Sequence, residues 1–244
     1  MRRIALVLVL LVTALAAAWW LVQIGWLQPN RPVAARYDVH GIDVSHHQGA
    51  IDWAAVRTDH IEFAYIKATE GADWHDPRFA ENWRGAGDAG LRRGAYHFFT
   101  FCTPGRPQAE HFLAVLRDAR GDLPPAVDVE FTGNCTRWDS IETIRAELAV
   151  FLAHVESEAG RRPIVYLPTS VHQRIVDGHF PDHALWVRHV FLAPPRRRYG
   201  TWLFWQFSQD GRIAGISRPV DLNVFRGSSA EFEQLFPRVE EPPR

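Results

Sequence analysis

Two acidic residues, Asp128 and Glu130, stand two positions apart in the apolar segment 126–131. If this segment is a strand, its side chains alternate, so both carboxylates point to one side with Cα atoms about 6.5–7 Å apart. Two carboxylates on one face of an apolar strand are costly to bury unless partners such as a helix N-terminus or a surface arginine satisfy them. Paired carboxylates at this separation also suit glycoside hydrolysis, with one as general acid and the other stabilising an oxocarbenium-like centre. From this segment alone, the two carboxylates could form either a structural or a catalytic pair.

The elements that must position this pair alternate along the chain. Apolar and β-branched segments predict eight strands, over residues 37–45, 62–68, 93–99, 126–131, 163–167, 185–190, 202–207 and 220–225. Helical patterns follow the first five strands, whereas the last three have little helical sequence between them. We therefore predict an α/β fold, a single-domain (β/α)5(β)3 TIM-like barrel with a mainly parallel sheet. An open doubly wound sheet is the alternative, although no glycine-rich phosphate loop follows the first strand.

Capping residues mark where the intervening helices begin. The signals are Asp52 before Trp53, Asp76-Pro77, Pro107, and Asp139 or Ser140, and Gly160 ends the longest helix. Active sites of parallel α/β barrels lie at the carboxyl ends of the strands. Asp128 and Glu130 close the fourth predicted strand, which favours the catalytic interpretation.

The composition limits the classes of function. The 244 residues include 27 basic and 28 acidic side chains, a formal net charge of −1. This balance argues against a nucleic-acid partner, which would require a strongly basic face. An apolar fraction of 47% is enough for one domain with a substantial core. Of the ten tryptophans, we expect at least half in the core, while others are candidates for sugar platforms in a cleft.

The N-terminus combines Arg2 and Arg3 with an uncharged apolar run of nineteen residues, Ile4 to Val22. As a helix this run spans about 28 Å, close to the thickness of a hydrocarbon core. The arginines keep the N-terminus in the cytoplasm and send the remainder across. We predict a membrane anchor with the catalytic domain outside the cytoplasm, periplasmic or extracellular. A cleaved signal peptide ending near Ala18 is the alternative and would give a secreted protein.

The predicted domain boundaries follow from these elements. Residues 1–30 form the anchor or signal with its linker, 31–37 a linker, 38–228 the barrel and 229–244 a C-terminal tail. Export permits a disulfide between the two cysteines, Cys102 and Cys135. Each follows the end of a predicted strand by a few residues, and the two strands are consecutive, so their loops should meet on one rim. Two unpaired buried thiols are the alternative.

Six motifs, in order and spacing, resemble glycoside hydrolase family 25, the Chalaropsis-type lysozymes or N-acetylmuramidases. They are HGIDVSHHQG at residues 40–49, IKATEG at 66–71, GAYHF at 94–98, VDVE at 127–130, WQFS at 205–208 and VDLNVF at 220–225. Each motif is weakly specific by itself, but all six in order are a strong signal. The resemblance covers about residues 38–226, essentially the whole exported domain.

The resemblance implies a flattened (β/α)5(β)3 barrel that cleaves the β-1,4 bond between N-acetylmuramic acid and N-acetylglucosamine in peptidoglycan. Carried over by motif position, Glu130 is the general acid, Asp128 assists, and Asp43 and Asp221 are acidic residues on the first and last strands. These strands are neighbours in a closed barrel, so we expect four carboxylates at one rim. Their mutual repulsion should raise at least one pKa, which suits proton donation to a leaving group. Retaining, inverting and substrate-assisted mechanisms all remain open.

Six further residues near predicted strand ends are candidates for substrate binding: Glu70, Tyr96, His97, Tyr166, Trp186 and Trp205. Burial in the core is the alternative for the aromatic residues and His97, and an ion pair with Lys67 is the alternative for Glu70. We expect no metal, because the adjacent His46 and His47 would point to opposite faces of a strand, and no cofactor. The expected partners are peptidoglycan glycan strands and a membrane, with no nucleic acid, and the protein should be a monomer.

The chain also departs from the family pattern. Arg188 and Val190 stand where a small residue and an aromatic residue are expected, and Phe207 replaces the usual tyrosine. These changes on late strands put the exact substrate in doubt more than the reaction. The alternatives are a non-catalytic glycan-binding barrel and a glycosidase acting on chitin-like N-acetylglucosamine polymers. The basic run 196–198 should be a solvated loop, with contact to an anionic wall polymer as its alternative.

Overall fold

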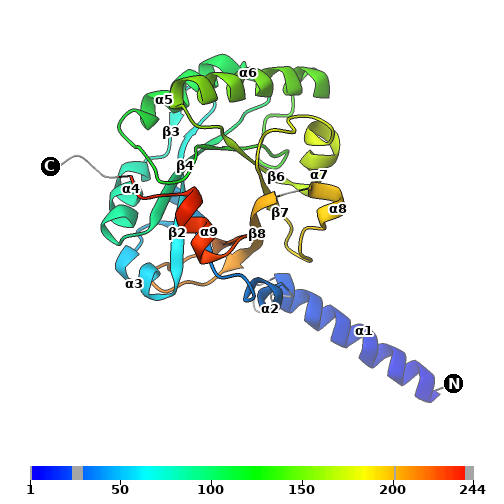
Figure 1. Cartoon of the computed structure of the whole chain (residues 1–244). Coiled ribbons are helices and arrows are strands. Elements are labelled where there is room, and N and C mark those ends of the chain that lie inside the picture. Colours follow the sequence, from blue (N-terminus) through cyan, green and yellow to red (C-terminus); the bar gives the residue numbers. More distant parts are fainter. Residues whose placement is uncertain (1, 24–29, 201, 240–244) are drawn as a thin grey trace.

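The computed structural model describes residues 2–23, 30–200 and 202–239. Eight strands close into a barrel with helices around much of its outside (Figure 1). The barrel strands are β1 (His40–Val44), β2 (Ile61–Glu70), β4 (Arg92–Phe98), β5 (Ala126–Asp128), β6 (Ile164–Pro168), β7 (Leu185–Arg188), β8 (Trp202–Gly211) and β9 (Val220–Phe225). The predicted (β/α)5(β)3 barrel is therefore confirmed.

The strand directions decide which residues reach the catalytic rim. All neighbours from β1 through β2 to β8 pair in parallel, whereas β9 is antiparallel to both β8 and β1 and so closes the barrel. Because β9 runs the opposite way, its first residues lie where the parallel strands end. Asp221, the second residue of β9, is consequently the register partner of Asp43 near the end of β1.

The observed strands differ from the predicted ones in two places. The segment 126–131 forms a strand only as far as Asp128, so Glu130 lies just beyond β5. The Val129 amide still donates to the carbonyl oxygen of Tyr166 at 3.0 Å, after which the chain turns away from the sheet. A ninth strand, β3 (Trp74–His75), was not predicted, and it pairs antiparallel with the end of β2.

Strand alternation separates an inner from an outer core. The inner cluster contains Phe63, Tyr65, Ala126, Ile164, Tyr166, Trp186, Phe204 and Phe225. The alternate residues pack outward against the helices, as Ala64 and Ile66 do on β2. The interior is crowded: a Cβ atom at Gly94 would lie 2.3 Å from the Tyr65 ring, so that position accepts no larger residue without repacking.

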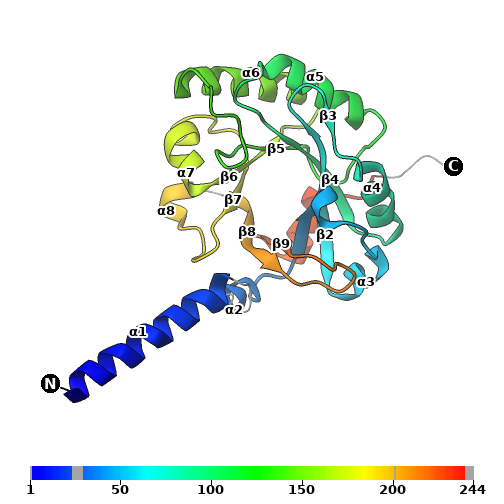
Figure 2. The ribbon, with the colours of Figure 1, turned by 180° about the vertical axis from the view of Figure 1, so that it is seen from behind.

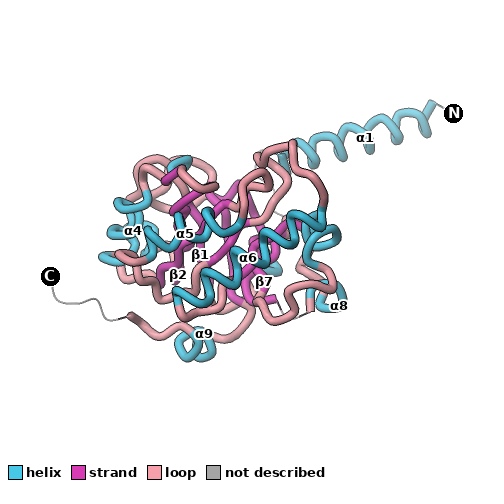
Figure 3. Tube along the Cα trace, turned by 90° about the horizontal axis from the view of Figure 1, so that it is seen from above, coloured by secondary structure: helices cyan, strands magenta, loops and turns pink. Residues whose placement is uncertain are grey.

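The helices lie on the outside, where their apolar faces cover the outer core. They are α3 (Trp53–Thr58), α4 (Phe79–Asp88), α5 (Gly105–Leu116) and α6 (Ile141–Ala159), the last two side by side along one flank (Figures 1 and 3). Asp52 and Ser140 accept hydrogen bonds from the first turns of α3 and α6, and Gly160 ends α6 at φ 63°, as predicted. Helix α4 begins at Phe79 rather than at Asp76. The Asp76 carboxylate lies just before it, where Oδ1 accepts from the Arg78 amide and Oδ2 accepts from the His46 amide, each at 2.9 Å.

The late part of the barrel carries only short helical segments. After β6 come α7 (Thr169–Val171) and the π-helical turn η2 (His172–Val176), and α8 (Arg196–Tyr199) follows β7. The segment predicted as a C-terminal tail contains α9 (Ser229–Leu235), whose start is fixed by a capping box between Ser228 and Glu231. Phe232 and Phe236 are buried against the inner cluster and close the end of the barrel away from the acids.

Helix α1 (Arg2–Gln23) extends away from the barrel (Figures 1 and 2). Its segment Ile4–Leu21 has a mean hydropathy of 2.6 and no buried residues, so it is long and apolar enough to cross a membrane. The short helix α2 (Arg31–Ala34) occupies part of the predicted linker, and Asn30 before it donates to the carbonyl oxygen of His189 at 3.1 Å. Residues 24–29 of the predicted anchor and linker, and the last five residues of the predicted tail, lie outside the described residues.

Candidate active site

A cavity of about 410 Å³ opens at the carboxyl ends of the parallel strands. Its lining includes all four predicted acids, Asp43, Asp128, Glu130 and Asp221. A larger cavity, of about 850 Å³, lies on the outside of the barrel against α5 and α6 and is lined mainly by arginine and apolar side chains. Because the paired carboxylates gather in the smaller cavity, we take that one as the candidate active site.

A chain of side-chain hydrogen bonds fixes Asp43. Its Oδ2 atom accepts from Asn223 Nδ2 at 2.7 Å and from Gln206 Nε2 at 3.0 Å. The chain continues on both sides, since Trp186 Nε1 donates to Asn223 Oδ1 at 2.7 Å and the Tyr166 hydroxyl donates to Gln206 Oε1 at 3.0 Å. These residues come from five strands, so the barrel wall itself holds this carboxyl group in place.

The four acids share one electrostatic property: each has a raised pKa. Burial raises the pKa of Asp43 to about 6, although hydrogen bonds from Asn223 and Gln206 oppose the shift. Burial, and then the charge of Asp43, raises the pKa of Asp221 well above its ordinary value. Both groups can therefore retain protons at a pH where exposed aspartates are fully ionised.

Asp128 and Glu130 form the second pair. Burial, followed by the charge of Glu130, raises the pKa of Asp128 well above its ordinary value. Burial also raises the pKa of Glu130, opposed first by the positive charge of Arg188. Asp128 is 9% exposed and its Oδ1 has no hydrogen-bond partner among the described residues, while the Glu130 side chain is 18% exposed. The deeper Asp128 binds a proton first, and Glu130 is the more accessible to a ligand.

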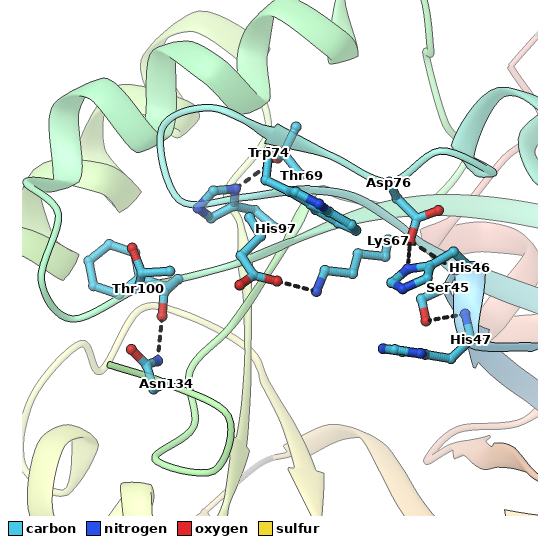
Figure 4. A network of polar contacts seen from close by, with 12 residues as sticks. Ser45, His46, His47, Lys67, Thr69, Trp74, Asp76, His97, Thr100 and Asn134 are labelled. Carbon is cyan, nitrogen blue, oxygen red and sulfur yellow. Dashed lines mark hydrogen bonds and ion pairs between the residues drawn. The ribbon is translucent and has the colours of Figure 1, made fainter. Parts of the chain in front are cut away.

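Two cationic side chains from opposite parts of the wall also line the cavity. Lys67 on β2 pairs with Glu70 through Nζ and Oε2 at 2.6 Å, and it also contacts the Trp74 ring at 4.9 Å (Figure 4). Arg188 at the end of β7 lies 3.9 Å from Glu130, from Nη1 to Oε2, and donates from Nη2 to Gln209 Oε1. These charges partly offset the cost of gathering four acids.

The structure brings some of the other predicted residues into the cavity and not others. Tyr96, Tyr166 and Trp186 line it. Glu70, His97 and Trp205 are not among its lining residues. The His97 ring contacts the Thr69 hydroxyl at 2.8 Å (Figure 4). Its other ring nitrogen contacts Gln108 at 3.1 Å, the side chain is fully buried, and burial lowers its pKa to about 3. Trp205 is fully buried in the outer core, and its Nε1 donates to the carbonyl oxygen of His189 at 2.9 Å.

The predicted disulfide, Cys102–Cys135, is present and joins the loops after β4 and β5, with Cα atoms 6.2 Å apart. The side-chain amide of Asn134 joins the same two loops. Its Oδ1 accepts from the Phe101 amide at 2.8 Å, and its Nδ2 donates to the carbonyl oxygens of Phe99 and Glu130 at 2.8 and 2.9 Å. The loop that carries Glu130 is thus fixed by one covalent bond and three hydrogen bonds.

Of the two adjacent histidines near the rim, His47 lines the cavity and His46 does not. His46 and His47 lie in a 3-10 turn rather than a strand, and their rings are 3.9 Å apart. His46 contacts Asp76 through both its amide and Nδ1, each at 2.9 Å (Figure 4). Within residues 2–23, 30–200 and 202–239, no group of three or more His, Cys, Asp or Glu side chains has the arrangement of a metal site.

Three residues of the site received no functional role from the sequence: Arg188, Gln206 and Asn223. Arg188 was named only as a departure from the family pattern, and Gln206 and Asn223 lie inside the quoted motifs. Strand alternation could have revealed two of the three, because Asn223 is two residues after Asp221 and Arg188 is two residues after Trp186. Each must share the inward face of its strand with a residue that was predicted.

Comparison with known proteins gives the family. The model of the Glycosyl hydrolases family 25 matches residues 42–216, a range that includes Asp43, Asp128 and Glu130 and ends before Asp221. The chain belongs to this family. This family 25 protein is 37% identical over 216 residues to YegX of Escherichia coli (strain K12), covering 86% of the chain and 78% of YegX. It is 37% identical over 209 residues to "Lysozyme M1" of Streptomyces globisporus, covering 81% of the chain and 71% of that protein.

A solved structure agrees. The family 25 glycosyl hydrolase from Bacillus anthracis superimposes with a TM-score of 0.76 at 35% identity, covering 82% of this chain and 94% of that one. The predictions of the family and of a glycoside hydrolase of the lysozyme type are therefore confirmed.

Proposed function

We propose that this family 25 protein is an exported muramidase that cleaves the β-1,4 bond between N-acetylmuramic acid and N-acetylglucosamine in peptidoglycan. The observation that carries the proposal is the cluster of four acids with raised pKa values in one rim cavity of a family 25 barrel. A carboxylic acid that stays protonated near neutral pH is what leaving-group protonation requires. The names of relatives such as "Lysozyme M1" agree with this substrate.

Glu130 acts as the general acid and Asp128 assists it. Glu130 suits proton donation because it is buried enough to keep a raised pKa and exposed enough to meet the glycosidic oxygen. The charge of Glu130 raises the pKa of Asp128, so the two acids interact within one cavity. A retaining pair needs a separation of about 5 Å, and an inverting pair needs about 6.5–9.5 Å to hold a water. Because both acids come from one short segment, which leaves little room for that water, we favour attack by the 2-acetamido group of the substrate, with Asp128 orienting it.

Asp43 and Asp221 complete the acid cluster from the opposite side. Asp43 is held by Asn223 and Gln206, so its position does not depend on a ligand. We assign both residues to hydrogen bonding with the sugar and to stabilising positive charge that develops at the reacting carbon.

The location of the enzyme is proposed from α1. The exposed apolar segment Ile4–Leu21 would anchor the protein in a membrane, with the barrel outside the cytoplasm. The anchor would then hold the enzyme close to the cell wall. A cleaved signal would instead release it.

The proposal is tested by replacing the acid and analysing the products. Glu130→Gln keeps the size of the side chain but cannot donate a proton, so turnover on purified peptidoglycan should fall about 10²–10⁴-fold while binding persists. Glu142→Gln, which changes an exposed glutamate in the first turn of α6, is the matched control and should keep full activity. Mass spectrometry should show products with N-acetylmuramic acid at the reducing end. Turnover unaffected by Glu130→Gln, or cleavage of chitin oligomers in preference to peptidoglycan, would refute the proposed function.

A further inference from the structure

Arg188 is the feature of the cavity that the proposed chemistry does not use. It stands at the carboxyl end of β7, on the inward face two residues after Trp186, and it lines the same cavity as the acids. The family pattern leads to the expectation of a small residue here. An arginine in its place brings a permanent charge beside the proposed proton donor.

The charge of Arg188 opposes the raised pKa values of Glu130, Asp43 and Asp221, but among the described residues its guanidinium donates no hydrogen bond to a carboxylate. Nη2 donates to Gln209, a neutral and exposed side chain on the neighbouring strand β8. Glu130 Oε2 is 3.9 Å from Nη1, which is beyond hydrogen-bonding distance. The side chain is 28% exposed, so a ligand can reach the remaining donors. Lys67 differs, because it is already bound to Glu70 at 2.6 Å and only 11% exposed.

The position next to Glu130 limits the group that Arg188 can bind. A guanidinium matches the planar geometry of a carboxylate and can hold it through two parallel hydrogen bonds. The ligand group must lie on a sugar beside the bond being cleaved, since Glu130 donates its proton to that bond. N-acetylmuramic acid differs from N-acetylglucosamine by a lactyl ether, which ends in a carboxyl group and is the attachment point of the stem peptide.

We propose that Arg188 forms a carboxylate-recognition site at the catalytic rim, which binds an acidic group carried by the muramic acid residue next to the scissile bond. This inference rests on the proposed function and adds the feature by which the enzyme distinguishes peptidoglycan from neutral chitin-like polymers. The raised pKa values of the four acids agree with it, because a carboxyl group with a raised pKa carries less negative charge on average and so repels an incoming carboxylate less.

The carboxylate has two possible sources. In glycan strands stripped of peptide it is the lactyl carboxylate itself. In intact peptidoglycan the lactyl group forms an amide, and the carboxylates belong to the stem peptide. Three substrates separate these sources: peptide-free strands, the same strands after methyl esterification, and intact peptidoglycan.

The test compares Arg188→Met with wild type on the three substrates. Loss of a charge-assisted pair should lower kcat/KM on the carboxylate-bearing substrate about 10–100-fold, mainly through a higher KM. Hydrolysis of the esterified strands should change less than about threefold, because their neutral ester offers no such pair. Arg188→Lys should restore only part of the activity, since an ammonium group lacks the planar fork. Arg84→Met, which removes an exposed arginine on α4 outside the cavity, is the control and should match wild type.

Each outcome decides the proposal. A loss confined to peptide-free strands identifies the lactyl carboxylate, and a loss confined to intact peptidoglycan identifies the stem peptide. Equal losses on acidic and esterified strands would overturn the proposal and assign Arg188 a purely electrostatic effect on Glu130.

A binding measurement separates this inference from the proposed function. Calorimetric titration of Glu130→Gln, with and without Arg188→Met, uses peptide-free and esterified oligosaccharides and needs no turnover. If Glu130→Gln binds the acidic oligosaccharide more tightly than the esterified one, and Arg188→Met abolishes this difference, carboxylate recognition by Arg188 is supported even if wild type proves inactive. Equal affinity for both oligosaccharides, together with full activity of Arg188→Met on intact peptidoglycan, overturns it even if wild type is an active muramidase.

Discussion

At the scale of single residues, the balance between burial and hydrogen bonding sets the charge of the acids. Asp43 shows this balance most clearly. Burial raises its pKa to about 6, even though Asn223 and Gln206 both donate to the same oxygen. Two neutral donors are therefore insufficient to offset the loss of water around a carboxylate.

This balance predicts that Asp43 costs stability at neutral pH. A carboxyl group whose folded-state pKa is raised favours folding below its unfolded pKa, near 3.8, and that contribution is lost as the pH rises through about 6. Asp43→Asn keeps an acceptor for both donors but carries no charge. It should raise the free energy of unfolding by roughly 3 kcal/mol at pH 7 and by almost nothing below pH 4, since one pKa unit corresponds to about 1.4 kcal/mol.

Urea denaturation of both proteins between pH 3.5 and 7.5 measures the difference. Asp182→Asn, which alters an exposed aspartate, serves as the control and should show no such trend. A difference between Asp43→Asn and wild type that is constant with pH would contradict the assigned cause.

At the scale of elements, the loop after β5 carries the proposed proton donor, Glu130, and is joined to the loop after β4. Because β5 ends at Asp128, the sheet does not fix Glu130 directly. The loop depends instead on the Cys102–Cys135 bond and on the hydrogen bonds of Asn134. A strand that continued to residue 131, as the apolar pattern predicts, would have needed neither.

Removing the disulfide should affect activity as well as stability. The bond closes a loop with a sequence separation of 33, so its loss should cost on the order of 3–4 kcal/mol through denatured-state entropy. Cys102→Ser with Cys135→Ser should lower the melting temperature and also kcat at a temperature where the variant is fully folded, because the Glu130 loop gains freedom.

The accompanying check is thiol counting under denaturing conditions. Protein purified from an oxidising compartment should show no free thiol without reductant. Two free thiols, or a serine variant with the kcat of wild type, would contradict the predicted link between this bond and catalysis.

At the scale of the whole molecule, α1 is separable from the barrel. Its apolar segment has no buried residues, and the barrel closes its inner core with its own Phe232 and Phe236. The full chain should therefore partition with membranes and resist carbonate extraction. A chain beginning at Asn30, which keeps the contact with His189, should be soluble and equally active on soluble glycan fragments.

The N-terminal sequence of the exported protein distinguishes anchor from signal. An intact N-terminus in the membrane fraction agrees with the anchor. A mature N-terminus near Ala17 or Ala18, or full-length protein that remains in the soluble fraction, would contradict it.

The linear pattern predicted the barrel because strand and helix periods are local properties of the chain. The eight strand positions, the caps at Asp52 and Ser140 and the Cys102–Cys135 pairing all depend on short segments and on their order. Alternation also assigned Asp128 and Glu130 to one face. It could further have separated Tyr96 from His97, since adjacent residues of a strand point to opposite sides, and the structure places only Tyr96 in the cavity.

Other features depend on distances between strands that are remote in the chain. The sequence does not show that Gln206 and Asn223 converge on one oxygen of Asp43, that Arg188 lies 3.9 Å from Glu130, or that Trp205 faces outward to His189. Residue types and order therefore determined the barrel and its acids. The tertiary structure alone decided their hydrogen bonds, burial and charge balance, because desolvation and Coulomb energies depend on distances of a few ångströms that only the closed barrel sets.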